Sequence, residues 1–324
     1  MTESHAAVTY ANYVRIESAR MFAGITAFAG GTNKWGHYRV PTPIDQQTVI
    51  RMNRDTLYSA AIVDVSRGAT LTIPEVGDRY VSVMIVSEDH YVNRVFHGAG
   101  EYSLTAAELG SDFVLAAGRV LVDAEDPADV AAVNAIQDGF GLHSVAGGTF
   151  VPPTYDEPSF ERTRNALLEL SRGLGGLDGC FGRREDVDPI RHLLGAASGW
   201  GGLPEQEAYY VMVDPGLPVG EYTLTVGDVP VDGFWSVSMY DAAGYFSENE
   251  AGAYSVNNIT ADRNDDGTVT IRFGGDPSRP NTLPIVEGWN YLVRLYRPRP
   301  EILDGTWQFP TIRQETAACQ ETTA

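Results

Sequence analysis

Residues 52–65 read MNRDTLYSAAIVDV. The first eight positions combine a carboxylate, a guanidinium, an amide, two hydroxyls and a phenol, and an apolar, strand-like run from Ala60 to Val65 follows them. Polar groups this dense beside buried β-structure must hydrogen-bond to one another or face a ligand. The stretch therefore predicts the start of a β-rich region and is the first candidate for a functional site.

Short runs with strand periodicity follow this stretch and return later in the chain. Turn-forming residues separate them, a spacing that favours antiparallel sandwich or jelly-roll-like sheets over β-α-β units. No convincing repeat relates the two β-rich halves residue by residue. The predicted strands span 79–86, 91–96, 102–104 and 113–122 in the first half, and 208–213, 222–226, 233–240, 268–273 and 291–296 in the second.

Helices are predicted at residues 10–28, from the helical spacing of apolar side chains, and between residues 125 and 200. In the latter region an aspartate stands before a proline at or near the first helical position, at Asp126, Asp156 and Asp188. The inner face of the helix after Asp156 is expected to consist of Phe160, Thr163, Leu167 and Leu170.

These patterns predict a β-dominated α+β fold with two antiparallel jelly-roll or sandwich-like modules. The expected divisions are an N-terminal helix and loop at 1–46, a first β module at 47–124, a helical connecting layer at 125–203, a second β module at 204–312 and a polar tail at 313–324.

The chain has 324 residues and a formal net charge of −20. Because an acidic surface repels phosphate backbones and anionic lipids, neither nucleic acid nor a membrane is expected as a partner. The first nine residues contain no apolar signal-peptide core, and no apolar run approaches the roughly 18 residues that a membrane span needs. A cytoplasmic protein is the resulting expectation. Two cysteines, Cys180 and Cys319, predict neither a disulfide framework nor a zinc site.

Several segments match one protein family: NRDTLY at 53–58, VDGFWSVSMYD at 231–241, AYSVN at 253–257, NTLP at 281–284, RLYRP at 294–298 and DGTW at 304–307. In these segments the chain resembles the DUF1254/DUF1214 proteins, in particular their short bacterial branch, over most of residues 47–310. The resemblance implies two β-rich modules of jelly-roll character, and some members carry hydrolase-like labels. The chain departs from the family pattern at residues 96–100, where longer relatives have a Gly-Thr-Arg-type motif, and at Thr282, where relatives often have tryptophan.

The segment from Asn53 to Tyr58 supplies the catalytic candidates. Arg54 suits an anion anchor, because its guanidinium binds oxyanions with two parallel hydrogen bonds, and Asn53 suits a second orienting group. Asp55 is the candidate general acid or base, with Tyr58 as a hydrogen-bond donor beside it. The alternative is structural: an Arg–Asp pair that ties a loop to a strand, with Asp55 capping a turn.

Aromatic and histidine residues in two other segments are candidates for binding a ligand. Trp35 and His37 lie in a loop that suits the mouth of a pocket, although a lone loop histidine is often solvated or structurally bonded. His90 and Tyr91 are expected as pocket donors. His90 and His97 are not expected to share a metal ion, because a separation of seven residues puts them on opposite faces of a continuous strand. A β-bulge or turn between them would allow both imidazoles to reach one metal ion.

The strand at 233–240 places Ser236, Ser238 and Tyr240 on one face, which either lines a cleft or faces solvent. Arg294 fits the same polar face, so Ser236, Tyr240 and Arg294 complete the binding candidates. Residues 262–267 match half of a calcium-binding loop, but a hairpin turn between 255–260 and 268–273 explains them better. The sequence contains no nucleophile elbow, P-loop, dinucleotide-binding glycine motif or HExxH motif, so no metal and no cofactor are expected.

The resulting expectation is a metal-independent enzyme with hydrolase or lyase chemistry. Its substrate would be a small organic or sugar-like molecule, bound in a cleft between the two β modules. Two alternatives are a non-catalytic protein that binds a small molecule or carbohydrate, and a self-assembling jelly-roll protein. A homo-oligomer is possible under each of these interpretations.

Overall fold

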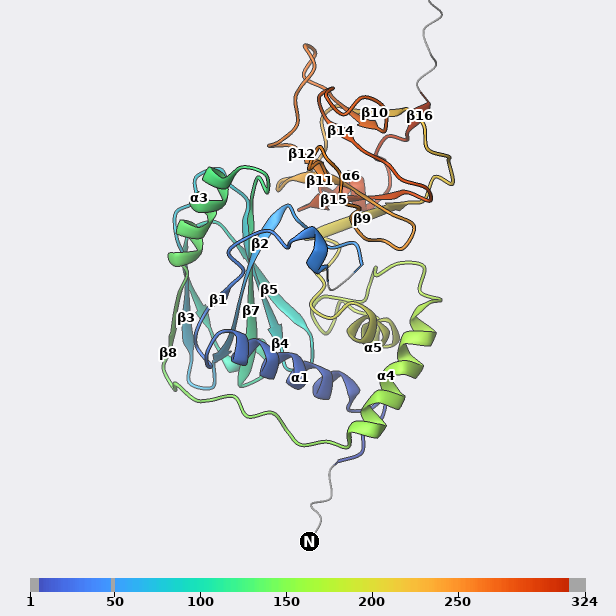
Figure 1. Ribbon diagram of the computed structural model, residues 1–324. Coiled ribbons are helices and arrows are strands. Elements are labelled where there is room, and N and C mark those ends of the chain that lie inside the picture. Colours follow the sequence, from blue (N-terminus) through green and yellow to red (C-terminus); the bar gives the residue numbers. More distant parts are fainter. Residues whose placement is uncertain (1–5, 48–49, 315–324) are drawn as a thin grey trace, which may run out of the picture. The chain divides into compact units, whose positions relative to one another are not determined.

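The computed structural model describes residues 6–47 and 50–314 (Figure 1). The chain forms two compact units that interleave along the sequence. Unit 1 consists of Met1–Val40, Thr56–Val122 and Asp126–Glu207, and unit 2 of Pro41–Asp55, Asp123–Glu125 and Ala208–Ala324. Antiparallel pairing dominates the sheets of both units, which confirms the predicted β-rich α+β class. Cys319 lies outside the described residues.

Unit 1 contains a sandwich of two antiparallel sheets. One has the strand order β1(Gly36–His37), β2(Thr56–Asp64), β7(Phe113–Leu121), β4(Val81–Ser87), β5(Val92–His97), and the other has the order β6(Gly100–Leu104), β3(Ala69–Ile73), β8(Gly141–Ser144). Alternate residues of these strands, such as Leu57, Leu71 and Val83, form the core between the sheets. The remaining residues of the larger sheet lie on its outer face, away from that core.

The helices of unit 1 are α1(Tyr13–Phe28), α2(Ala106–Leu109), α3(Pro127–Asp138), α4(Glu157–Ser171) and α5(Pro189–Ser198). The three predicted aspartate caps are confirmed, because Asp126, Asp156 and Asp188 each accept a hydrogen bond from a backbone N–H in the first turn. The predicted inner face of α4 is wrong at Leu170, which is 64% exposed. The predicted residues Phe160 and Leu167 do face inward and pack in one cluster with Tyr13 of α1.

Unit 2 is a second sandwich. One sheet has the order β12(Ser255–Asn257), β11(Trp235–Tyr240), β15(Asn290–Tyr296), β9(Ala208–Val213), and the other has the order β14(Thr282–Leu283), β13(Val269–Phe273), β10(Tyr222–Val226), β16(Arg313–Gln314). The short helices η1(Ile44–Gln46) and α6(Pro300–Leu303) belong to the same unit. The predicted turn at 264–267 forms, but its flanking strands β12 and β13 belong to different sheets, so the predicted hairpin is wrong.

The two sandwiches have the same topology. Of the strands β2, β4, β5 and β7 in unit 1, β2 comes first in the chain and pairs with β7, which comes last. The strands β4 and β5 then follow β7 in the sheet. Unit 2 repeats this order as β9-β15-β11-β12. The second sheets also correspond, because β6-β3-β8 matches β13-β10-β16, and a helix precedes the final strand in both units. The topology therefore relates two halves that the sequence did not relate.

One pair of glycines tests the packing of these strands. A Cβ atom added at Gly233, just before β11, would lie 2.7 Å from the Tyr296 carbonyl oxygen, whereas a Cβ at Gly24 in α1 meets nothing within 4 Å. We expect Gly233→Ala to lower the free energy of unfolding by about 1–3 kcal/mol, because backbone must move to relieve the clash. Gly24→Ala should raise it by roughly 0.5–1 kcal/mol through helix propensity. Denaturant unfolding measures both, and equal stability of the two variants would contradict this packing.

Candidate functional site

The polar face of β11 is buried beneath residues 41–47 and 50–55, which are called here the covering segment. Ser236, Ser238 and Tyr240 are all fully buried, while Trp235, Val237 and Met239 on the opposite face belong to the sandwich core. The Tyr240 hydroxyl donates a 2.8 Å hydrogen bond to the Met52 carbonyl oxygen. The predicted division of faces is thus confirmed. The polar face is the surface on which the covering segment packs.

Arg294 of β15 is the centre of this buried polar face. Its guanidinium donates to the Ser238 hydroxyl and the Tyr240 hydroxyl at 2.8 Å each, and to the Arg51 carbonyl oxygen at 2.7 Å. Burial alone would lower the pKa of Arg294, but the Tyr240 and Tyr296 phenols and the Asp55 carboxylate outweigh that effect and raise it. For the Tyr240 phenol, by contrast, burial raises the pKa. Arg294 therefore stays charged inside the fold.

Asp55 lies inside the same polar cluster and is 1% exposed. Its Oδ1 atom accepts hydrogen bonds from Ser255 Oγ at 2.8 Å and from Asn257 Nδ2 at 3.1 Å. Its Oδ2 atom is buried and has no hydrogen-bond partner within the part of the chain that the structure describes. The carboxylate thus bonds to two residues of β12. Its negative charge also offsets part of the cost of burying the positively charged Arg294 guanidinium.

Arg54 and Asn53 make further contacts that hold the covering segment in place. Arg54 Nη2 donates to Glu125 Oε1 at 2.9 Å, Nη1 donates to the Thr42 carbonyl oxygen, and the guanidinium lies 5.3 Å from the centre of the Tyr254 ring. Asn53 Oδ1 accepts from the Asp55 backbone N–H at 2.9 Å. This is an Asx-type turn, in which a side-chain amide shapes the backbone two residues on.

Tyr58 belongs to unit 1, where it begins a row of polar residues across the outer face of the five-stranded sheet. The strand registers place Tyr58 beside Arg119, Arg119 beside Ser82, and Ser82 beside His97. The Arg119 guanidinium lies 5.4 Å from the Tyr58 ring centre and donates to the Gly201 carbonyl oxygen at 3.3 Å. This row, from four different strands, is called here the unit 1 row.

Unit 2 carries a matching row, called here the unit 2 row. Its registers place Tyr210 beside Arg294, Arg294 beside Ser236 and Ser236 beside Asn257. Each residue also occupies the same place in its strand: the tyrosines are third from the start, the serines second, the arginines third from the end, and His97 and Asn257 last. Both rows therefore read tyrosine, arginine, serine and then one variable residue.

The variable residue binds a carboxylate in both units. In unit 2 Asn257 donates to Asp55, the residue directly before β2. In unit 1 His97 Nε2 lies 2.7 Å from Glu207 Oε2, and Glu207 directly precedes β9. Each carboxylate therefore stands directly before a strand of the other unit in sequence, Asp55 before β2 and Glu207 before β9. The difference between the rows is an amide in one and an imidazole in the other.

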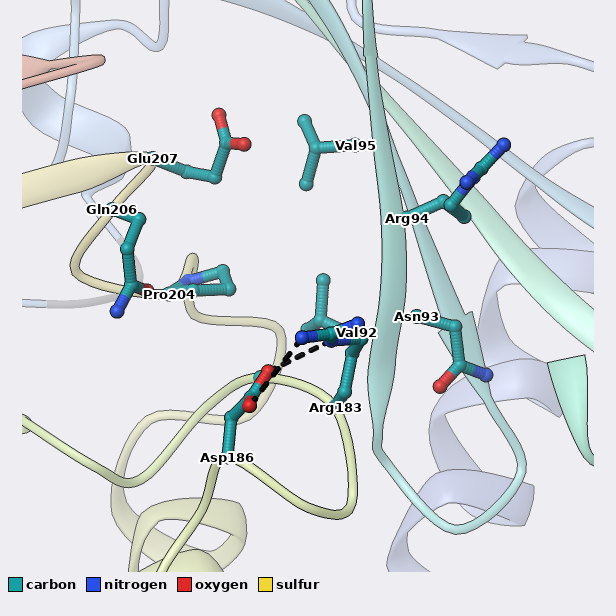
Figure 2. A pocket seen from close by; sticks show the side chains of 10 residues that line it. Val92, Asn93, Arg94, Val95, Arg183, Asp186, Pro204, Gln206 and Glu207 are labelled. Atoms are coloured by element: carbon teal, nitrogen blue, oxygen red, sulfur yellow. Dashed lines mark hydrogen bonds and ion pairs between the residues drawn. The ribbon is translucent and has the colours of Figure 1, made fainter.

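A pocket of about 500 Å³ lies in unit 1 next to this histidine–carboxylate pair. Figure 2 shows Glu207, Gln206 and Pro204 on one side, and the side chains of Val92 and Val95 of β5 facing them. The ion pair between Arg183 and Asp186, 2.8 Å long, lies at another edge of the pocket. The walls thus combine apolar carbon surfaces with amide, carboxylate and guanidinium groups.

His97 and Glu207 form a hydrogen-bonded pair at the wall of the pocket. Its Nδ1 atom lies 3.2 Å from the Val81 carbonyl oxygen, which requires a proton on Nδ1. Nε2 is therefore the atom that shares a proton with Glu207, a residue of the pocket wall. Both side chains are about one-fifth exposed, His97 at 20% and Glu207 at 23%. A neighbouring histidine and carboxylate at this distance are suited to general acid–base chemistry.

Trp35 and His37 lie elsewhere in unit 1. Trp35 packs against the sandwich core and its ring centre lies 5.3 Å from that of Phe140. His37 in β1 contacts Ser59 Oγ through Nδ1 at 2.8 Å, and burial together with the charge of Arg39 lowers its pKa. The predicted aromatic loop is thus attached to the edge of the five-stranded sheet.

His90 and Tyr91 pack on the aromatic and histidine side chains around α5. His90 is fully buried and its ring lies 5.2 Å from that of Trp200, and Tyr91 stacks on His192 at 4.6 Å. His90 precedes β5 in a left-handed conformation with φ of 64°, so it is not part of the strand that contains His97. Within residues 6–47 and 50–314, no group of three or more His, Cys, Asp or Glu side chains is arranged to hold a metal ion.

Sequence reasoning missed most of the unit 1 row. His97 was considered only as a metal ligand, and Ser82, Arg119 and Glu207 were not considered. The four residues lie on separate strands or loops, and 110 positions separate His97 from Glu207. Strand registers bring Ser82, Arg119 and His97 together, and a long-range contact adds Glu207, so no local motif could have identified the group.

Comparison with known proteins assigns the family. One family model, described as protein of unknown function (DUF1254), matches residues 32–106, and another, protein of unknown function (DUF1214), matches residues 218–300. The chain is therefore a DUF1254/DUF1214 domain-containing protein. The first match covers most strands of the unit 1 sandwich and the second most strands of the unit 2 sandwich. No curated protein matches the chain.

Two solved structures are similar to the chain. The VPA0106 protein from Vibrio parahaemolyticus aligns with a TM-score of 0.73 at 18% identity, over 95% of this chain and 98% of that one. A putative uncharacterized protein from Burkholderia cenocepacia aligns with a TM-score of 0.49 at 14% identity, over 94% of this chain and 86% of that one. The first likeness supports the fold. Within the described residues, no helix has both the length and the apolar character to cross a membrane.

The buried carboxylate in unit 2 gives a stability prediction. We expect Asp55→Ala to lower the free energy of unfolding by about 2–4 kcal/mol, because it leaves Ser255 and Asn257 without their acceptor and a buried cation less compensated. Asp45→Ala is the matched control on the same covering segment, where the aspartate is exposed, and it should change stability by less than about 0.5 kcal/mol. Urea unfolding measures both variants, and a neutral Asp55→Ala would show that this carboxylate does not hold unit 2 together.

The buried imidazole of His90 gives a pH prediction. Burial, with a smaller contribution from nearby His192, lowers the pKa of His90 to about 3. Because the unfolded chain binds the proton with a pKa near 6.5, it binds more protons than the native state between about pH 6.5 and 3. Stability should therefore be full above pH 6.5 and fall by up to about 1.4 kcal/mol per pH unit below it.

The His90→Asn variant isolates this contribution, because asparagine tolerates the left-handed backbone at this position. We expect it to be less stable than the wild type at pH 8 but to lose less stability between pH 6.5 and 4. His143→Asn, which removes an exposed imidazole, is the control. An unchanged pH slope in His90→Asn, measured by urea unfolding at each pH, would contradict the prediction.

Proposed function

We propose that this protein is a metal-independent enzyme that acts on a small, hydroxyl-bearing organic or sugar-like molecule by hydrolase or lyase chemistry. The proposed site is the unit 1 pocket, with His97 and Glu207 as the proton-transfer pair. The observation that carries the proposal is the 2.7 Å contact between His97 Nε2 and Glu207 Oε2, since Glu207 is itself part of the pocket wall.

The hydrogen bond from His97 Nδ1 to the Val81 carbonyl oxygen supports this role. It fixes the tautomer and orientation of the ring, as the third member of a catalytic triad does for its histidine. One mobile proton then lies between Nε2 and the Glu207 carboxylate. Such a pair can take a proton from a substrate hydroxyl or an activated water and return it to a leaving group in a later step.

The pocket walls support the substrate class. Val92, Val95 and Pro204 offer apolar surfaces to the carbon skeleton of a small molecule, and Gln206 offers an amide to its hydroxyl groups. The Arg183 guanidinium has five N–H donors, and its ion pairs with Asp186 and Glu185 do not use all of them, which leaves donors for a substrate oxygen. Figure 2 shows the side chains of Asn93 and Arg94 leading away from this space, so they contribute less.

The unit 2 row supports the choice of unit 1. There an asparagine, Asn257, takes the place of His97, and a carboxamide cannot exchange protons near neutral pH. Both Asn257 and Asp55 are also buried, at 2% and 1% exposed. Unit 2 therefore keeps the structural contact, and unit 1 has a titratable pair beside a pocket. On this proposal Asp55, Arg54 and Asn53 are structural, and Tyr58 positions Arg119.

The experiment replaces His97 with its counterpart in the unit 2 row. Wild type, His97→Asn and Glu207→Gln are screened by thermal shift against sugars, sugar lactones and hydroxy acids, and any ligand found is incubated and analysed for products by mass spectrometry. We expect a stabilising ligand that the wild type converts. His97→Asn should keep its fold and lose about 10²–10⁴-fold in turnover, because an acid–base group is removed.

His143→Asn, exposed in the same unit, is the control and should match the wild type. Conversion that persists in both His97→Asn and Glu207→Gln would overturn the proposal. A ligand that binds the wild type and is never converted would point instead to a non-catalytic binding protein that uses the same pocket.

A further inference from the structure

A second pocket, of about 560 Å³, opens within the unit 2 sandwich. One wall is the inner face of β9 and β15, and the other is the stretch between α6 and β16. This pocket has no lining residue in common with the unit 1 pocket. Its lining includes Tyr209, Val211, Tyr291, Trp307, Phe309 and Thr311.

The lining contains no acidic or basic side chain, although 20% of the chain is charged. Four aromatic rings, those of Tyr209, Tyr291, Trp307 and Phe309, contribute to it. The polar side-chain groups are few: the two phenol hydroxyls, the indole N–H of Trp307, Gln308 and Thr311. Sites for small molecules typically combine such an apolar lining with a few polar groups that orient the ligand.

Folding leaves much of this apolar surface incompletely covered. Trp307, Phe309 and Ile312 contact the unit 2 core but are only partly buried, and the same holds for Tyr209 and Val211. Partly exposed rings and branched side chains converge here on one concavity instead of being scattered over the surface. A ligand that covered them would remove this apolar surface from water, which favours binding.

The charge of the pocket and of the protein selects among ligands. An anionic ligand would find no cation in the lining and would approach a chain of net charge −20. A cationic ligand would find no carboxylate in the lining to replace its lost hydration. Burial raises the pKa of the Tyr291 phenol to about 12, so this hydroxyl remains a neutral group at physiological pH.

We propose that the unit 2 pocket binds a neutral, mainly apolar small molecule that contains a ring system. The rings of the ligand stack on or pack edge-on against Trp307 and Phe309, and a single hydroxyl or carbonyl group bonds to one of the polar groups of the lining. This site is independent of the proposed chemistry at His97, because it lies in the other unit and shares no residue with it.

The alternation of β9 provides a matched pair of variants. Val211 lines the pocket, whereas Met212, the next residue, is on the opposite face and 60% exposed. Val211→Trp fills the pocket with a side chain that strands accept readily, and Met212→Trp adds the same ring outside it. The probe is N-phenyl-1-naphthylamine, a neutral aromatic amine whose fluorescence rises in apolar surroundings.

We expect the wild type and Met212→Trp to bind the probe with equal affinity, and Val211→Trp to bind it at least tenfold more weakly. Thr311→Arg, which places a cation at the pocket wall, should also weaken binding. Circular dichroism confirms the fold of each variant. Absence of probe binding by the folded wild type, or equal binding by Val211→Trp and Met212→Trp, would overturn the proposal. Neither result would bear on the turnover expected at His97.

Discussion

The buried charge of Arg294 is the constraint on which unit 2 depends. A guanidinium removed from water is tolerated only when its donors are satisfied, and the two main-chain carbonyl oxygens of Arg51 and Met52 supply acceptors. The covering segment must therefore stay where it is, and Asp55 and Arg54 are fixed with it. Arg119 does the corresponding task in unit 1 through the Gly201 carbonyl oxygen. In each unit an arginine on the outer face of a sheet thus holds a covering segment against that face.

This correspondence explains how one topology can serve two purposes. The tyrosine, arginine and serine of each row pair with one another across neighbouring strands, and this pairing is the same in both units. The fourth position lies at the end of its strand, where a change of residue disturbs the core least. Asparagine there donates a hydrogen bond to a carboxylate, and histidine there lies within hydrogen-bond distance of one. Under the proposed function, the histidine adds proton transfer in unit 1 while unit 2 keeps the structural contact.

Local features of the chain were predicted well, because they depend on neighbouring residues. The aspartate caps of α3, α4 and α5 and the alternation of β11 follow from side-chain hydrogen bonds and strand geometry within a few positions. Long-range pairing was not predictable: nothing near residues 255–260 shows that β12 pairs with β11 and not with β13. The same limit applies to the site. Most polar groups at 53–58 bond to residues far away in sequence, such as Glu125 and Asn257, and periodicity could not show this or that Asp55 and Tyr58 belong to different units.

The interleaving of the two units has a consequence for synthesis on the ribosome. Unit 1 has all its described segments once residue 207 has emerged, and it can fold while the rest of the chain is still being made. Residues 41–55 emerge early but have no surface to cover until β11 and β15 follow, more than 180 positions later. During that interval the apolar residues of this segment, such as Ile44 and Met52, do not yet have the unit 2 surface on which they pack. Nascent chains of this protein therefore pass through a stage in which one unit is complete and a part of the other waits, open to capture by chaperones.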